Sequence, residues 1–338
     1  MGKKLKILQV FDTPYVTQRG HDFTEEFKDE SWNTEDHVYK TLCENGHKVQ
    51  LLGIHNDINP LIEEIKENKP DLIFNLTEVF RQESHLDKNF AGLLELLDVP
   101  YTGASPDSLM ICNNKALSKK IMSFHRIRGP RFQTFYRKYR VWLPKRLKLP
   151  LIVKPLSEEA SRGISLASIV DNEGSFLERV KFIHENMSKD AIVEEYIEGR
   201  ELYVGVIGNK RIKVLPPREV KFGNIPDDEP RIATYKAKWD LKYREKWGIK
   251  NVFAGKLPNG VGEKIEDICK RAYRALNMDC YARFDIRVTA QGRVYILEAN
   301  ANPCLAKDDE VGQSAEKAGI SYNKLIEKIV NLAFNRGK

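Results

Sequence analysis

Two neighbouring segments near the end of the chain alternate polar and apolar residues, as β-strands with one buried face do. The first, Tyr281–Val288, reads YARFDIRV, and the second, Val294–Asn300, reads VYILEAN. This period of two places successive side chains on opposite faces of a sheet. Gln291 and Gly292 stand between the segments and suit the two-residue loop of an antiparallel hairpin.

The register of this hairpin predicts a polar cluster on one of its faces. With the loop at the centre, Asp285 faces Glu298 and Arg283 faces Asn300. Directly opposed like charges destabilise a strand pair, so a positive group should lie between the two carboxylates. Two carboxylates and an amide oxygen are also hard ligands, which suit Mg²⁺ or Mn²⁺ carrying phosphates. The alternative that stays open is a hairpin with a solvated polar face.

The first hundred residues alternate short apolar runs with helical patterns. The runs lie at 6–10, 49–54 and 71–75, the helical patterns at 34–45, 61–66 and 90–97, and the segment 99–103 follows. This order predicts a parallel, doubly wound sheet. No glycine fingerprint follows the first run, so dinucleotide binding is not supported there.

The pattern of the remaining sequence predicts α+β units with antiparallel strands. We expect helices at 115–126, 175–186, 261–276 and 321–336, a basic linker at 126–148, and strands at 151–155, 164–170, 191–197 and 202–207. The predicted domains are 1–112 (doubly wound α/β), 113–200 (α+β) and 201–338 (α+β with the hairpin).

Three features before the hairpin are candidates for ligand binding. Lys154 ends a buried apolar run, where a lysine binds phosphate or extends its ammonium to solvent. The loop Ser157–Gly163 can present backbone N–H groups to phosphates, although an ordinary hairpin loop has the same composition. The segment Glu194–Glu201 has carboxylates that can accept hydrogen bonds from a nucleoside, or it is an acidic surface turn.

Composition narrows the class of ligand. The chain has 338 residues, of which 30% are charged and 41% hydrophobic, with a net charge of +7 and no apolar run as long as a membrane helix. The basic excess fits anionic small ligands such as nucleotides, while the basic linker keeps an RNA-binding alternative open. Five scattered cysteines form neither a metal spacing nor a disulfide framework, so we expect a cytoplasmic protein.

Taken together, the segments follow the order found in ATP-grasp enzymes, and the chain most closely resembles D-alanine–D-alanine ligases. The motifs that carry the resemblance lie at 92–103, 114–118, 152–155 and 297–300. The resemblance implies an ATP-grasp fold of mixed α/β and α+β class. In that fold ATP lies between two α+β subdomains, behind a Rossmann-like N-terminal domain. It also implies phosphorylation of a carboxylate, followed by attack of an amine on the acyl phosphate.

The resemblance also assigns roles to individual residues. The residues implied to bind ATP are Lys115 and Lys154 (phosphates), Glu194 (adenine), Glu201 (ribose), Glu195 and Ile197 beside them, and Lys238 (γ-phosphate). The catalytic residues implied are Arg283, Lys238 and Ser161, the last in a loop that covers the phosphates. The Mg²⁺ (or Mn²⁺) ligands implied are Asp285, Glu298 and Asn300, in agreement with the pairing derived from the hairpin.

Three segments depart from the pattern of D-alanine–D-alanine ligases. They are residues 12–35, 75–81 and 304–310, which replace segments that hold the amino-acid substrates in those enzymes. We therefore expect these segments to line the acceptor side of the cleft and to change the substrate. Lys307 and Arg81 are candidate partners for a substrate carboxylate, and Glu78, Asp12 and Glu35 are candidates for the general base.

The sequence thus predicts an ATP-dependent carboxylate–amine ligase that forms an amide or peptide bond through an acyl phosphate, with unidentified small-molecule substrates. One alternative is a D-alanine–D-alanine or related dipeptide ligase. Another is a non-catalytic nucleotide-binding regulator or an RNA-binding protein, although nucleic acid is the less favoured partner. We expect no membrane association, and a homodimer stays an open expectation.

Overall fold

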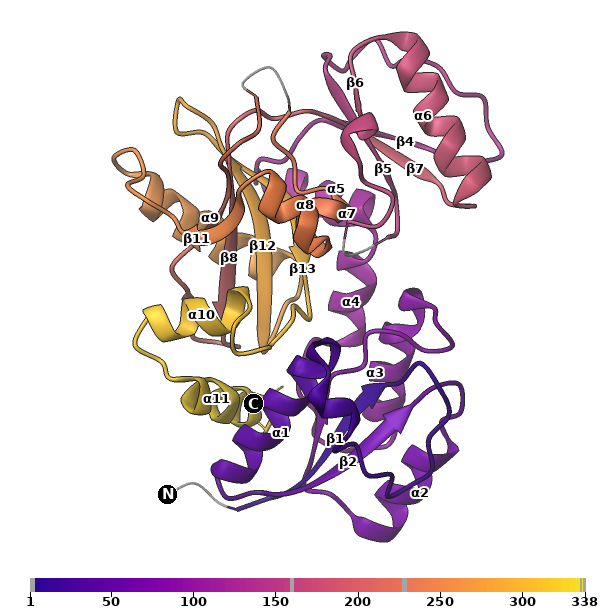
Figure 1. Ribbon diagram of the computed structural model, residues 1–338, viewed down its shortest axis with the longest axis vertical. Helices are drawn as coiled ribbons and strands as arrows, with labels where there is room; N and C mark the ends of the chain where they lie inside the picture. The colour runs from indigo at the N-terminus through magenta and orange to yellow at the C-terminus, as the bar shows by residue number, and fades with distance from the viewer. Residues whose placement is uncertain (1–3, 159–160, 227–229, 335, 337–338) are drawn as a thin grey trace.

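The computed structural model of the chain describes residues 4–158, 161–226, 230–334 and 336. The strands in these residues form three sheets, which follow one another along the chain (Figure 1). No helix in the described part of the chain has both the length and the apolar character needed to cross a membrane.

The N-terminal sheet is parallel and has helices on both faces, as predicted. Its strands are β1 (Lys6–Asp12), β2 (Lys48–Ile54) and β3 (Leu72–Asn75) in the order β2-β1-β3, with helices α1 (Asn33–Glu44), α2 (Asn59–Asn68) and α3 (Asp87–Leu96). Side chains of β1 alternate between two cores, with Ile7 packed near α1 and Leu8 near α2 and α3. The segment 99–103 contributes only a single bridge, between Ile73 and Tyr101.

The middle sheet is antiparallel and has one helix on its outer face. It consists of β4 (Phe132–Phe135), β5 (Leu151–Pro155), β6 (Ile169–Val170) and β7 (Ala191–Glu195) in the order β4-β7-β5-β6, with α6 (Glu173–Asn186). Two expectations were wrong here. The basic linker contains β4, and the strand expected at 164–170 is reduced to Ile169–Val170, preceded by a 3₁₀ turn at Leu166–Ser168.

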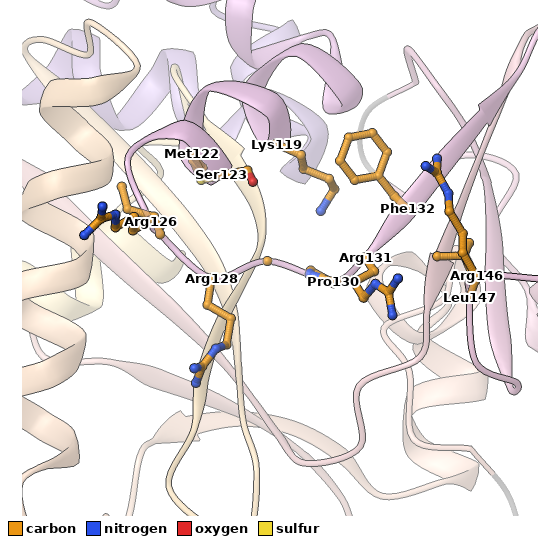
Figure 2. A pocket seen from close by; sticks show the side chains of 12 residues that line it. Lys119, Met122, Ser123, Arg126, Arg128, Pro130, Arg131, Phe132, Arg146 and Leu147 are labelled. Carbon is orange, nitrogen blue, oxygen red and sulfur yellow. The ribbon is translucent and has the colours of Figure 1, made fainter.

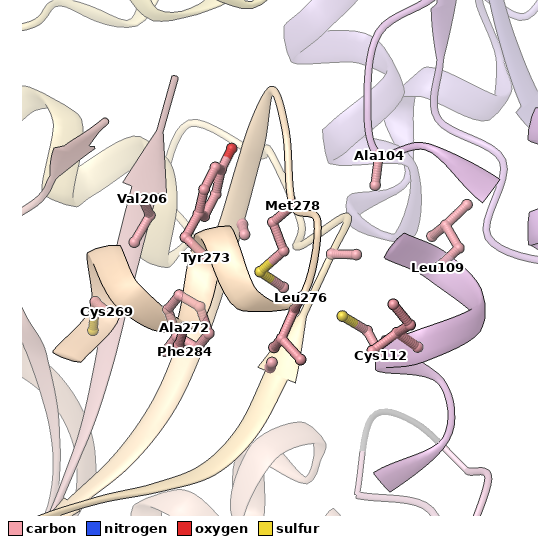
Figure 3. Close-up of a cluster of buried hydrophobic side chains, with 14 of the residues drawn as sticks. Ala104, Leu109, Cys112, Val206, Cys269, Ala272, Tyr273, Leu276, Met278 and Phe284 are labelled. Atoms are coloured by element: carbon pink, nitrogen blue, oxygen red, sulfur yellow. The ribbon is translucent and has the colours of Figure 1, made fainter. Parts of the chain in front are cut away.

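The C-terminal sheet carries the polar hairpin. Its strands are β8 (Arg200–Ile207), β9 (Lys213–Val214), β10 (Arg218–Phe222), β11 (Ile249–Phe253), β12 (Tyr281–Val288) and β13 (Val294–Asn300). Helix α9 (Val261–Ala275) covers one face, where Tyr273 and Leu276 pack against β8, β12 and the short helix α4 (Pro106–Cys112) in one core (Figure 3). Helices α7 (Tyr235–Trp239) and α8 (Leu241–Lys246) pack against the opposite face of the sheet, which carries the polar residues of the hairpin.

The predicted pairs of the hairpin are confirmed, although its loop differs. Asp285 pairs with Glu298 and Arg283 with Asn300. The loop has three residues, 290–292, because Thr289 donates to the carbonyl of Arg293 and Gly292 takes a left-handed φ of 71°. A bulge at Leu297 then shifts the register by one residue, because Ile286 pairs with Ile296. The longer loop and the bulge cancel, so the predicted pairs hold.

The last helix of the chain returns to the first sheet. Helix α11 (Tyr322–Phe334) lies beside α1, and its buried residues Leu325, Ile326 and Ile329 pack with Ile7 and Phe74 of the N-terminal sheet (Figure 1). The two ends of the chain therefore share one core, and the N-terminal sheet depends on residues more than two hundred positions away for one of its faces.

This packing predicts a large effect from a single truncation in α11. Ile329 is 0% exposed, so we expect Ile329→Ala to destabilise the protein by about 2–4 kcal/mol through lost burial and a residual cavity. Urea unfolding followed by fluorescence measures the change. Lys324→Ala, on the exposed side of the same helix, is the control and should shift the midpoint little. A midpoint of Ile329→Ala equal to that of the control would contradict the packing.

Candidate functional site

Two surfaces face each other at the candidate site, one from the middle sheet and one from the C-terminal sheet. On the C-terminal sheet, Asp285 of β12 lies between Tyr203 of β8 and Glu298 of β13 in the register. On the middle sheet, Lys154 of β5 and Glu194 of β7 lie on the face opposite α6. Helix α5 (Lys115–Phe124) lies alongside and contributes lysines.

Asp285 is buried and is the most heavily hydrogen-bonded carboxylate of the hairpin. Arg283 donates to it twice, from Nε at 2.8 Å and Nη2 at 3.2 Å, and Asn300 Nδ2 donates to Oδ1 at 3.2 Å. Lys238 Nζ lies 3.9 Å from Oδ2. Both cations also lie over the ring of Tyr203, at 5.0 Å for Arg283 and 5.5 Å for Lys238. The three predicted residues Arg283, Lys238 and Asn300 therefore meet at one carboxylate.

Glu298 has its own cation, which comes from α5. Lys115 Nζ lies 2.7 Å from Glu298 Oε1. The side chain of Asn114 accepts from the backbone N–H of Leu117 and begins the helix, which fixes Lys115 in its first turn. Burial alone would raise the pKa of Glu298, but Lys115, with help from Lys154 and Lys238, lowers it to about 2. The positive charge expected between the two carboxylates is thus shared among separate cations.

Glu194 holds two lysines on the middle sheet. It is 1% exposed, with Lys154 Nζ 3.2 Å from Oε2 and Lys119 Nζ 3.4 Å from Oε1. Burial opposes the charge, yet the two ammonium groups outweigh it and lower the pKa of Glu194. Lys119 also donates to the carbonyl oxygen of Leu297, the bulge residue, at 2.6 Å. Sequence reasoning missed Lys119, although it lies four residues after Lys115 and so on the same helical face.

Glu201 is held by an arginine that sequence reasoning also missed. Arg287 Nη2 lies 2.6 Å from Glu201 Oε2, because β8 and β12 pair these residues directly. Arg287 Nη1 donates to the carbonyl of Ile197 at 3.0 Å, and Nη2 donates to that of Arg231 at 2.7 Å. The signal that could have found Arg287 is its place two residues after Asp285, on the same face of the strand.

Two predicted residues do not join this cluster. The side chain of Glu195 lies on the other side of β7 from Glu194, and it accepts from the backbone N–H of Lys148 at 3.0 Å. Ser161 follows residues outside the described part of the chain and has a left-handed φ of 59°. Among the described residues, no hydrogen bond joins its hydroxyl to the lysines or carboxylates of the cluster.

A cleft of about 770 Å³ opens beside this cluster and runs towards the N-terminal sheet. Its lining includes Lys238, Arg283, Glu298 and Asn300, together with residues from all three segments that depart from the ligase pattern. The expectation that these segments share one cleft is therefore confirmed. Lys307 and Arg81, expected to bind a substrate carboxylate, are exposed and are absent from the described lining, so their role stays a prediction without support from this cleft.

The candidate general bases Asp12, Glu35 and Glu78 line the cleft as well. Asp12 accepts from the backbone N–H groups of Glu78 at 2.7 Å and Val79 at 3.3 Å. Burial, followed by the charge of Asp12, raises the pKa of Glu35 from 4.5 to about 7. Glu35 can therefore exchange a proton near neutral pH.

A second, smaller pocket of about 460 Å³ lies where α5 leads into β4 (Figure 2). Lys119 reaches it from the cluster, and Arg126, Arg128, Arg131 and Arg146 line it from the exposed basic segment. Apart from Lys119, none of the residues described in the cluster contributes to this pocket.

Comparison with known proteins identifies the family. The family model "D-ala D-ala ligase C-terminus" matches residues 120–331. The chain is 30% identical to the uncharacterized protein y4sG of Sinorhizobium fredii over 89% of this chain and 87% of that protein. It is 31% identical to a D-alanine–D-alanine ligase of Bordetella petrii, covering 73% and 72% of the two chains. The chain belongs to the D-alanine–D-alanine ligase family.

A solved structure of D-alanine–D-alanine ligase from Bacillus anthracis, complexed with ATP, has the same fold. It matches with a TM-score of 0.75 and 22% identity, covering 98% of each chain. The ATP-grasp fold expected from the sequence is thus confirmed. Family membership also makes the chain an ATP-dependent ligase that forms a C–N bond, and the alternative of a non-catalytic regulator was wrong.

The ion pair between Lys115 and Glu298 predicts a pH-dependent loss of stability. Because Lys115 is 5% exposed, we expect Glu298→Gln to destabilise the free protein at pH 7, by about 1–3 kcal/mol. The depressed pKa of Glu298 means that its contribution is present above pH 4.5 and is lost as the pH falls towards about 2. Urea unfolding at pH 7 and pH 3 measures the difference in stability between the variant and the wild type at each pH. Equal stability of variant and wild type at pH 7 would exclude a stabilising ion pair.

The contribution of Glu35 to folding stability should depend on pH with the opposite sign. Its pKa is raised, so the folded state loses stability as the pH rises from 4.5 through about 7, where the half-buried carboxyl ionises. We expect Glu35→Gln to be more stable than wild type at pH 8.5, on the order of 2 kcal/mol, and nearly equal to it at pH 4.5. Thermal unfolding at the two pH values tests this. A pH-independent difference would mean that Glu35 titrates normally.

Proposed function

We propose that this chain uses ATP to join a small-molecule carboxylate to an amine through an acyl phosphate. The observation that carries the proposal is the gathering of cations around carboxylates on two facing sheets. The cations are Lys115, Lys119, Lys154, Lys238, Arg283 and Arg287, and the carboxylates are Glu194, Glu201, Asp285 and Glu298. The excess of cations suits a polyanionic ligand such as the triphosphate of ATP.

The lysines and Arg283 are proposed to bind and activate the phosphates. Lys115 comes from α5 and contacts Glu298, Lys154 comes from β5 and contacts Glu194, and Lys238 comes from α7. When a substrate carboxylate oxygen attacks the γ-phosphorus, the bond to the β–γ bridging oxygen breaks and ADP leaves. Arg283, fixed by two hydrogen bonds to Asp285, is placed to stabilise the charge that develops. Ser161 is proposed to cover the phosphates from its loop.

The opposed carboxylates fit a divalent cation that arrives with the nucleotide. Asp285, Glu298 and the amide oxygen of Asn300 would hold Mg²⁺ or Mn²⁺, since such ions take one or two carboxylates and complete their shell with phosphates. No three His, Cys, Asp or Glu side chains of the described residues form a metal site by themselves, which agrees with an ion that depends on the nucleotide. Bound there, the ion would neutralise phosphate charge.

The residues around the β7–β8 turn are proposed to hold the nucleoside. Glu201 can accept from the ribose hydroxyls beside its ion pair with Arg287. Glu194 is buried under Lys119 and Lys154, so we assign it to positioning those lysines, while its contact with adenine stays a prediction. Glu195 points away from the cluster, and we assign nucleotide contact at Glu195 and Ile197 to their backbone groups.

The second half of the reaction needs a base. The amine nitrogen attacks the acyl carbon, inorganic phosphate leaves, and the nitrogen gives up one proton. Glu35 is the best candidate for its acceptor, because its raised pKa of about 7 lies near neutral pH and it lines the cleft beside Asp12.

A dipeptide ligase is the second candidate, and the relatives favour it. An Aquifex aeolicus D-alanine–D-alanine ligase is 28% identical over 87% of this chain. The three departing segments line the cleft, which argues for substrates other than D-alanine. None of the five cysteines, all of which lie in the described residues, forms a disulfide, which supports the proposal of a reducing cytoplasm. A homodimer stays a prediction.

The test is ATP turnover with paired substrates. We expect ADP and phosphate release to require one carboxylate–amine pair together with Mg²⁺, and D-alanine alone to give little release. Arg283→Lys should lower kcat by about a hundredfold or more while leaving nucleotide binding largely intact, because it removes the forked contact to Asp285. Lys307→Gln, outside the cleft, is the control. Robust D-alanyl-D-alanine formation would favour the second candidate, and turnover of Arg283→Lys at the wild-type rate would remove Arg283 from the mechanism.

A further inference from the structure

The wall of the cleft away from the lysines is lined by carboxylates. The three departing segments contribute acidic side chains to this wall, and in the described lining they contribute no lysine or arginine. The acidic residues are Asp12, Glu30, Glu35, Glu78, Asp308, Asp309 and Glu310. They come from the ends of β1 and β3, from the start of α1 and from the start of α10 (Glu310–Lys317). The fold therefore brings negative charge from distant parts of the chain to one wall.

Most of these carboxylates form no ion pair with a lysine or arginine of the described residues. Glu310 is ion-paired, with Arg218 Nε 3.0 Å from Oε2. In the part of the chain that the structure describes, no ion pair reaches the carboxylates of Asp12, Glu30, Glu35, Asp308 and Asp309. Asp12 instead accepts from backbone N–H groups, and Asp309 accepts from that of Glu310 at 2.7 Å. Like charges in a partly buried cleft repel one another until a cation enters.

The arrangement does not suit a metal ion. Among the described residues, no three His, Cys, Asp or Glu side chains converge closely enough to hold one. The carboxylates are spread along a wall, so a single point charge would meet only some of them. An extended ligand with a separated positive group can meet them at several places.

A buried hydroxyl in the same cleft also lacks a partner. Tyr203 is 4% exposed and lines the cleft, and its hydroxyl has no hydrogen bond within the described residues. Its neighbours in the sheet are Asp285 and Arg218. A buried hydroxyl costs stability unless it is hydrogen-bonded, which indicates that a polar ligand group completes this part of the site.

We propose that the acceptor side of the cleft binds a substrate with a positively charged amino or guanidino group in addition to the reacting amine. A basic amino acid or a diamine has this chemistry. The inference rests on the proposed ligase function and names the substrate class of that same site. It differs from the expectation of an anionic substrate held by Lys307 and Arg81, neither of which is in the described lining of the cleft.

Binding of matched ligands tests the charge without requiring turnover. The protein, loaded with a non-hydrolysable ATP analogue and Mg²⁺, is titrated calorimetrically with lysine and with norleucine, which has the same carbon chain without the ε-amino group. Both enantiomers are used, and ornithine with norvaline forms a second pair. We expect the cationic member of a pair to bind about tenfold more tightly. Equal affinities within both pairs would overturn the proposal.

A substitution in the acidic wall tests whether this wall binds the cationic group of the substrate. Asp308 is exposed at the rim, so Asp308→Asn should fold normally, and we expect it to raise the KM of the cationic substrate about threefold to fivefold without changing the KM of ATP. Lys307→Gln changes the neighbouring charge outside the cleft and should leave the KM of the cationic substrate and the KM of ATP unchanged. A cationic substrate KM that is the same in Asp308→Asn and wild type would contradict the assigned wall.

The two levels of the proposal fail in different ways. Preferential binding of lysine without phosphate release from any pair would leave the substrate class standing and overturn the ligase reaction. Efficient ligation of neutral amino acids, with no preference for their cationic counterparts, would leave the ligase standing and overturn the substrate class.

Discussion

The opposition of Asp285 and Glu298 across β12 and β13 is the constraint on which the rest of the site depends. Two carboxylates side by side on one sheet face are unstable alone, and the hairpin itself supplies only Arg283 to one of them. The remaining positive charge has to come from other elements, Lys115 from α5 and Lys238 from α7. The hairpin thus constrains the positions of the helices α5 and α7, which carry these lysines.

The cleft is divided electrostatically along its length. Near the two sheets, lysines and arginines outnumber the carboxylates that hold them, while towards the N-terminal sheet the wall is acidic. Such a field orients a ligand before any hydrogen bond forms, because a molecule with opposite charges at its two ends has one favourable direction. The two halves also come from different kinds of structure. Strands and the helices α5 and α7 carry the cations, whereas the acids lie at the end of β1, in the loops that follow β1, β3 and β13, and at the starts of α1 and α10. The acidic half can therefore change with little effect on the sheets.

Sequence periodicity predicted the hairpin well because strand alternation is a local property. The loop was misjudged, and the pairs were still right because the bulge at Leu297 offset the extra loop residue, which no local pattern reveals. Strand β4 was missed because the basic residues around it hid a short apolar pattern. Lys119 and Arg287 were recoverable from helical and strand spacing, whereas the positions of Lys307 and Arg81 outside the cleft follow from tertiary folding alone.

The packing of α11 on the N-terminal sheet sets an order of events during synthesis. The strands of that sheet leave the ribosome well before the helix that covers one of their faces, because more than two hundred residues separate β3 from α11. At about 5–20 residues per second, roughly tens of seconds separate β3 from α11. Throughout that interval Ile7, Leu72 and Phe74 lack their final cover, so the nascent chain exposes an apolar surface of the kind that chaperones recognise. Emergence of α11, and not completion of the first sheet, is then the event that lets the N-terminal region reach its native packing.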